Sequence, residues 1–147
     1  MTSNNTDTVR SGNADNRENA MFDTTRAFAS FAVPDAARAR AFYADTLGLD
    51  VRPVEGMEEE GLLSIDLGEG RSILVYPKPD HAPAVFTVLN LVVDDAEAAV
   101  DELARRGVQT LRYDEFDQDA KGIARGTPTV AWFADPFGNV CSVIQEA

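Results

Sequence analysis

The sequence carries one pattern twice, with the two copies offset by 60 residues (28 against 88). Residues 28–51 read FASFAVPDAARARAFYADTLGLDV, and residues 88–110 read VLNLVVDDAEAAVDELARRGVQT. Each copy has an apolar strand pattern, an acidic turn, an amphipathic helix pattern, a glycine and a second strand. Internal repetition of this length indicates that one structural unit is present twice. The repeat therefore predicts two βα-containing modules with one cavity between them.

The acidic turn and the glycine mark the two ends of the helix in each copy. Asp35 matches Asp95 and, after a slip of one residue, Gly48 matches Gly107. Aspartate caps a helix because its carboxylate accepts hydrogen bonds from free backbone N–H groups. Glycine ends a helix because it adopts the left-handed conformation without strain. The pattern predicts helices over residues 36–47 and 95–106.

Eight short apolar segments, bounded by glycine, proline and acidic turns, predict strands. They lie at 27–33, 49–54, 61–67 and 71–76 in the first module, and at 85–93, 108–113, 129–134 and 139–145 in the second. The order βαβββ, given twice, predicts an α+β domain over residues 26–147, with modules at 26–77 and 84–147 and a stiff proline-rich linker between them. We expect a curved eight-stranded mixed sheet around a concave cavity, with the helices on the convex side.

Composition excludes several classes of function. Residues 1–25 are polar and lack apolar periodicity, which predicts a disordered tail. The formal net charge of −12 argues against the basic face that a nucleic-acid partner requires. The chain has no apolar run of membrane-helix length and no signal-peptide pattern, and its single cysteine, Cys141, excludes a disulfide framework or a cysteine-based zinc site. We expect a cytoplasmic protein without a membrane or nucleic-acid partner.

Several phrases of the sequence resemble one protein superfamily. The first module contains VPD followed by FYADTLGL, and the second contains VDD, a helix ending in LARRGV, and AWFADPFGNVCSVIQ. Together they resemble the vicinal oxygen chelate superfamily, which includes glyoxalase I, extradiol dioxygenases, fosfomycin-resistance transferases and bleomycin-binding resistance proteins. The resemblance covers residues 27–146. It implies the fold expected above and a homodimer, in some members with modules exchanged between the chains.

The resemblance also implies where a metal ion would be bound. In metal-dependent members each module supplies two ligands, one from the start of its first strand and one from its last strand, and these are His, Gln or Glu. The matching positions here are Phe28, Val88 and Ser142, with the fourth within residues 73–76, where Tyr76 is the one conceivable donor. Phe and Val cannot bind a metal, and serine is a poor ligand at neutral pH. We expect no metal and no other cofactor, which disfavours the usual glyoxalase or dioxygenase chemistry.

Alternation along the strands extends this set of positions. If the positions implied by the resemblance face the cavity, Ser30 and Asn90 face it too. The predicted ligand-binding residues are Phe28, Ser30, Tyr76, Val88, Asn90 and Ser142. Apolar walls with a few neutral polar groups suit a mostly apolar ligand. In the alternative interpretation these side chains fill the cavity and bond to each other. The opposite faces are predicted to pack under the helices: Ala29, Phe31, Val33, Leu89, Leu91, Val93, Cys141 and Val143.

Other features allow both a functional and a structural interpretation. His81, the single histidine, lies in the linker and is either an exposed side chain or a base. The loop 112–126 carries Tyr113, Phe116 and Ile123 and either closes over a ligand, docks on the surface or contacts a second subunit. Trp132 and Phe133 are adjacent in one strand, so only one of them can face the cavity. Residues 58–60, three adjacent glutamates, are typical of a solvated turn.

The sequence leaves two classes of function. The first is a metal-free protein that binds a small organic molecule in the concave sheet, as the bleomycin-binding members of the resembled superfamily sequester a drug. The acidic surface favours a cationic or amphipathic ligand for it. The second is an enzyme, a metal-dependent or metal-free lyase, isomerase or dioxygenase, that uses Tyr76, His81 or a loop carboxylate. A purely structural dimer is a third interpretation. The missing metal ligands favour the first class, and no catalytic residue is predicted.

Overall fold

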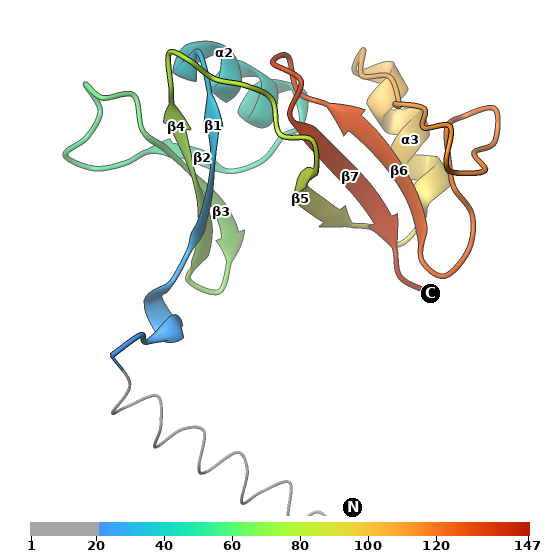
Figure 1. Ribbon diagram of the computed structural model, residues 1–147, viewed down its shortest axis with the longest axis horizontal. Coiled ribbons are helices and arrows are strands. Elements are labelled where there is room, and N and C mark those ends of the chain that lie inside the picture. Colours follow the sequence, from blue (N-terminus) through green and yellow to red (C-terminus); the bar gives the residue numbers. More distant parts are fainter. Residues whose placement is uncertain (1–20) are drawn as a thin grey trace, which may run out of the picture.

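The computed structural model describes residues 21–147, which form two mixed β-sheets, with the first helix between them and the second helix against the C-terminal sheet (Figure 1). The predicted tail lies mostly at residues 1–20, outside the described residues, and stays a prediction there. Thr24–Arg26 forms one 3-10 turn, η1, in which the Asp23 carboxylate accepts the Thr25 N–H. The α+β class expected from the repeat is confirmed.

Each module folds into its own sheet. The N-sheet contains β1 (Ala29–Val33), β2 (Val51–Pro53), β3 (Leu63–Gly68) and β4 (Arg71–Pro77) in the order β1-β4-β3-β2. The C-sheet contains β5 (Thr87–Val92), β6 (Thr129–Ala134) and β7 (Val140–Gln145) in the order β5-β7-β6. In both sheets the first strand runs parallel to the last strand of its module, and the other pairs are antiparallel. The repeat seen in the sequence is therefore a repeat of strand topology.

The helices begin and end where the matched residues predict. The first helix is α2 (Ala36–Arg40), continued by the π-helical turns of η2 (Ala41–Thr46), and the second is α3 (Ala96–Arg105). Asp35 accepts the Arg38 N–H and Asp95 accepts the Ala98 N–H, each at 3.1 Å. The two terminal glycines have φ of 77° (Gly48) and 80° (Gly107), the left-handed region that favours glycine. Local signals therefore set the bounds of both helices.

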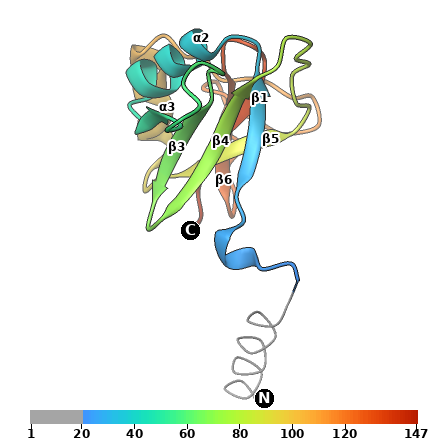
Figure 2. The same cartoon turned by 90° about the vertical axis from the view of Figure 1, so that its left-hand side faces the viewer.

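The helix-facing sides of the two sheets share one hydrophobic core. Phe31 and Val33 of β1, Leu89 of β5, and Cys141 and Val143 of β7 are buried there, as alternation predicts, whereas Ala29 is exposed. The α2–η2 segment lies between the sheets (Figures 1 and 2). Its Phe42 ring lies 6.5 Å from the ring of Phe133 in β6. One core thus joins the helix-facing side of the N-sheet to that of the C-sheet.

The strands of the described residues form two separate sheets of four and three strands, in place of the one eight-stranded sheet expected. Among the described residues β1 pairs only with β4 and β5 only with β7, so the two sheets are not joined at their edges. Both helix-facing sides contribute to the shared core, and the opposite face of each sheet is left open. The sequence pattern could not reveal this, since it identifies the two faces of a strand but not their orientation relative to the other module.

The predicted strand at 108–113 is also not formed. Thr110 makes an isolated bridge to Phe133, and the Leu111 N–H donates to the Trp132 carbonyl. Beyond this point the Gln118 side chain accepts the Tyr113 N–H at 2.7 Å and donates to the Leu111 carbonyl at 2.9 Å. A side chain therefore satisfies the backbone groups that a neighbouring strand would otherwise satisfy, and the chain leaves the sheet.

A buried hydrogen-bond network joins the modules. The Tyr43 hydroxyl of η2 donates to Asp135 Oδ2 at 2.8 Å, although the two residues are 92 positions apart. Asn139 Nδ2 donates to the same oxygen at 3.0 Å and to the Ala32 carbonyl of β1 at 2.9 Å. The Asn139 Oδ1 atom accepts the Ala84 N–H of the linker at 3.2 Å. Asp135 and Asn139 thus connect η2, β1, the linker and the turn between β6 and β7.

We predict that Asn139→Ala lowers the free energy of unfolding by about 2–4 kcal/mol, because it leaves several buried polar groups without partners. Urea denaturation followed by circular dichroism measures the change. Gln109→Ala, at an exposed position, is the control and should stay within about 0.5 kcal/mol of the native chain. An equal effect of the two substitutions would contradict a special role for Asn139.

Candidate functional site

Three cavities lie near the residues singled out in the sequence. The central cleft, of about 270 Å³, has β1 on one side and the linker and the start of β5 on the other. The N-face cavity, of about 480 Å³, lies on the open face of the N-sheet. The C-face cavity, of about 330 Å³, lies on the open face of the C-sheet. Ligand pockets generally have about 300–1,000 Å³, so the two face cavities have sizes suited to a small molecule.

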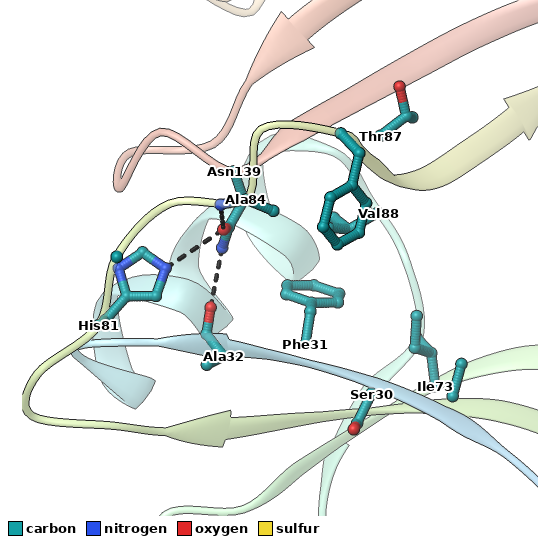
Figure 3. Close-up of a pocket in the computed structure, with 12 residues that line it drawn as sticks. Ser30, Phe31, Ala32, Ile73, His81, Ala84, Thr87, Val88 and Asn139 are labelled. Atoms are coloured by element: carbon teal, nitrogen blue, oxygen red, sulfur yellow. Dashed lines mark hydrogen bonds between the residues drawn. The ribbon is translucent and has the colours of Figure 1, made fainter.

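The central cleft is lined mostly by apolar side chains, with His81 and Asn139 at one end and the hydroxyl residues Ser30 and Thr87 elsewhere along it (Figure 3). Phe31 and Val88 line it, and at the polar end His81 Nε2 lies 3.2 Å from Asn139 Oδ1. Because Asn139 already bonds to β1 and to the linker, this contact holds the histidine in the network that joins the modules. His81 is half-buried, not the exposed side chain favoured by its place in the linker. Its position is explained by this structural contact.

The N-face cavity combines apolar and charged groups. Strand register places Ser30, Leu74, Ser64 and Arg52 opposite one another across β1, β4, β3 and β2. Phe28 lies at its edge and is 65% exposed. Arg52 forms a two-pronged contact with Asp50, with nitrogen–oxygen distances of 3.0 and 2.9 Å. This face therefore offers serine hydroxyls, one apolar patch and charges of both signs.

The register also identifies the fourth metal-ligand position, which the sequence left open. Asn90 pairs with Ser142 in the C-sheet, and its match in the first module, Ser30, pairs with Leu74. Leu74 is therefore the equivalent of Ser142, and Tyr76 lies two residues farther along β4. Neither Leu74 nor the other matched positions, Phe28 and Val88, carries a donor atom for a divalent cation. The residues present at these positions do not fit a metal site.

The structure brings only some of the predicted site residues together. Ser142 Oγ donates to Asn90 Oδ1 at 2.6 Å, and Ser142 is fully buried. Ser30 and Val88 both border the central cleft, where the Ser30 hydroxyl points away from the Phe31 ring (Figure 3). Phe28 lies in the N-face cavity, and Tyr76, half-buried, lines none of the three cavities. For Asn90 and Ser142, the interpretation that the side chains bond to each other describes what is observed.

Aromatic side chains that the sequence did not assign to the site line the C-face cavity. Phe133 is in the core, so Trp132 points to the open face, opposite Ser142. The Trp132 ring stacks on Phe116 with centroids 4.9 Å apart and meets Tyr113 edge-on at 5.3 Å. Phe86 also borders the cavity. The alternation of β6 indicates that one of its two aromatics faces outward, but the sequence does not show which other rings gather around it.

The loop 112–126 is docked on α3. Lys121 contacts Glu97 at 3.0 Å and Asp101 at 2.8 Å, and Arg125 contacts Glu97 and Asp119, each at 2.9 Å. Hydrogen bonds from Lys121 and Arg125 lower the pKa of the Glu97 carboxyl. Each of these ion pairs is exposed and contributes little alone. Together they attach the part of the loop that carries Lys121 and Arg125 to α3. This geometry agrees with a docked surface loop.

Comparison with known proteins identifies the family. The model of the Glyoxalase/Bleomycin resistance protein/Dioxygenase superfamily matches residues 25–143. The chain belongs to this superfamily. The resemblance noted in the sequence motifs is thereby confirmed at the level of the superfamily.

Individual relatives of this superfamily member differ in what they do. The methylmalonyl-CoA epimerase of Mus musculus mitochondria is 28% identical over 128 residues, which cover 79% of this chain and 69% of the epimerase. An antibiotic binding protein from Streptomyces sp. CB03234 is 27% identical, with a TM-score of 0.59 over 82% of this chain and 96% of that one. A glyoxalase family protein from Bacillus anthracis, at 21% identity and a TM-score of 0.64, covers 86% of this chain and 100% of its own and shares the fold.

The described residues contain neither a cluster suited to a metal ion nor a helix suited to span a membrane. Residues 21–147 contain no group of three or more His, Cys, Asp or Glu side chains arranged to hold a metal ion. Within the same range, no helix has the length and apolar character required to cross a membrane.

Cys141 is buried under the helices, as predicted. Its Sγ atom lies 3.7 Å from the Tyr43 hydroxyl, and the side chain is fully buried. Burial raises the pKa of the Cys141 thiol to about 12. Burial also raises the pKa of the Tyr43 hydroxyl. Both groups therefore keep their protons in the folded protein at pH values where an unfolded chain loses them.

We predict that alkaline pH destabilises the fold through these two groups. Because both pKa values are raised by folding, their contribution is fully present below about pH 9 and is lost as the pH rises toward 12. Chemical denaturation at a series of pH values from 7 to about 11 measures the loss. Cys141→Ala should lose stability less steeply, by up to about 1.4 kcal/mol per pH unit. Identical slopes for the variant and the native chain would contradict the assignment.

Proposed function

We propose that this protein binds a small organic ligand on the open faces of its sheets and does so without a metal ion. The proposal rests mainly on which residues occupy the positions that the resemblance implies for metal ligands. These residues are Phe28, Leu74, Val88 and Ser142. The open faces, in contrast, carry cavities of about 480 and 330 Å³. The antibiotic binding relative, 27% identical over most of both chains, supports ligand capture as the function.

We further propose that the ligand site is completed in a homodimer. Each sheet carries its own cavity on its open face, so one chain presents two half-sites in place of one enclosed cavity. Large apolar side chains in and beside the edge strand β5 are exposed: Val85 at 98%, Phe86 at 67% and Val92 at 62%. A two-fold arrangement would place the N-face of one chain against the C-face of its partner and cover these side chains. Such a dimer would enclose the ligand.

A lyase or isomerase reaction is the second candidate function. It is favoured by the likeness to methylmalonyl-CoA epimerase, 28% identical over 79% of this chain. The resemblance implies that members which catalyse such reactions use a divalent metal. The residues at the matched positions here do not supply a set of donor atoms for a metal ion. A metal-free reaction would need a base in a cavity, and the single histidine, His81, is engaged with Asn139. Ligand binding without turnover therefore agrees better with the side chains present.

The purified protein should contain no stoichiometric divalent metal, and Ni, Zn, Mn or Fe should not raise its unfolding temperature, because the matched positions lack donor atoms. Elemental analysis and thermal unfolding measure this, and Ser142→Ala should leave both results unchanged. One tightly bound metal per chain, with a matching rise in stability, would contradict metal-free binding. A metal-dependent enzyme would then be the preferred hypothesis.

The protein should behave as a dimer of about twice 15.9 kDa in size-exclusion chromatography with light scattering. Val92→Glu, which places a charge on the open side of β5, should shift the dimer toward monomer without loss of helical signal. Ala104→Glu, on the exposed side of α3, is the matched control and should remain dimeric. A native chain that is monomeric at high concentration would contradict the proposal that the ligand site is completed in a homodimer.

A further inference from the structure

We infer that the C-face cavity is a stacking subsite for a planar aromatic cation, so that the ligand class of the proposed binding function is a polycyclic aromatic carrying positive charge. The inference rests on that proposed function. It is drawn from three observations on this chain: the arrangement of four aromatic side chains, the docking of the loop that supplies two of them, and the distribution of charge along that loop.

The aromatic side chains leave a slot between them. Trp132, Phe116 and Tyr113 form one group, with ring centroids between 4.9 and 6.2 Å apart. Phe86, on the approach to β5, borders the same cavity but makes no ring contact with that group among the described residues. The cavity of about 330 Å³ is therefore bordered by the Trp132 group on one side and by Phe86 on another. A flat ring system that enters it can stack on π-faces, the geometry that aromatic contacts favour.

The loop that carries Tyr113 and Phe116 is set in place before any ligand arrives. Gln118 donates to the carbonyls of Leu111 and Gly122 and accepts the Tyr113 N–H, at distances from 2.7 to 2.9 Å. Lys121 and Arg125 fix the following residues to Glu97 on α3. A wall that is already ordered loses little conformational entropy on binding, which favours tight capture by a few contacts.

Charge along the loop favours a cation. Asp114, Glu115 and Asp117 flank Phe116, and in the described part of the chain none of these carboxylates has a hydrogen bond or ion pair. The basic residues of the loop are all engaged: Arg112 with the Ala120 carbonyl, and Lys121 and Arg125 in ion pairs. Glu115 itself borders the cavity. A cation over an indole or phenyl face gains further attraction from the ring quadrupole.

The single tryptophan of the chain makes the subsite directly observable. Since Trp132 is the only tryptophan, its fluorescence reports this cavity and no other. We would titrate the native dimer with three flat tricyclic probes: cationic proflavine, neutral acridone and an anionic anthraquinone sulfonate. Equilibrium dialysis on the same samples measures total binding wherever it occurs. We expect proflavine to quench Trp132 with saturation, acridone to bind more weakly and the sulfonate not to bind.

Variants at exposed positions test the walls without disturbing the core. Phe116→Ala and Phe86→Ala, at side chains 48% and 67% exposed, should each weaken proflavine binding by about fivefold to tenfold. Phe22→Ala, an exposed phenylalanine outside the cavity, is the control and should have no effect. Glu115→Gln should weaken proflavine binding by about twofold to fivefold but leave acridone unchanged, with Glu60→Gln as its control.

The outcomes separate this inference from the function on which it rests. Proflavine that is retained in dialysis without quenching Trp132, and without loss of affinity in Phe116→Ala, would overturn the stacking subsite and leave small-molecule binding standing at another cavity. Equal or stronger binding of the sulfonate would overturn the preference for a cation and with it the inference. Absence of proflavine binding would do the same, whereas the proposed function would fail only if a thermal-shift screen of chemically diverse ligands found none.

Discussion

The hydrogen bonds of Asp135 and Asn139 hold the two modules in their observed orientation. Their side chains sit in the turn between β6 and β7, yet they bond to Tyr43 of η2, to the Ala32 carbonyl of β1 and to the linker. The carboxylate is buried, and four donors surround it: the Tyr43 hydroxyl, the Asn139 amide and two backbone N–H groups of its own turn. A buried network of this kind fixes geometry because any other arrangement would leave polar groups unsatisfied.

This orientation decides where a ligand can bind. With α2 and η2 held between the sheets, each sheet turns its helix-facing side inward and its open side to solvent. The two faces then differ in chemistry: the N-face carries serines and paired charges, whereas the C-face carries a group of aromatic rings beside free carboxylates. The proposed shared site in a homodimer and the proposed preference for an aromatic cation both rest on this difference between the faces.

The sequence anticipated much of the local structure. The caps at Asp35 and Asp95, the helix-ending glycines and the burial of Phe31, Leu89 and Cys141 follow from signals within a few residues, namely side-chain period, capping chemistry and turn residues. It failed where a nearby side chain outside the expected strand changed the outcome. The strand expected at 108–113 is lost because Gln118 takes over its backbone partners, and pattern alone does not reveal such a substitution.

By itself the sequence determined the repeat, the bounds of the helices, the superfamily and the absence of metal donors at three of the matched positions. These are properties of residue identity and local spacing. Only the tertiary structure decided that Leu74 pairs with Ser30, that the modules form two separate sheets, and that Trp132, Phe116, Tyr113 and Phe86 meet at one cavity. Each of these depends on contacts between segments far apart in the chain, and no short-range pattern encodes which distant surfaces pack together.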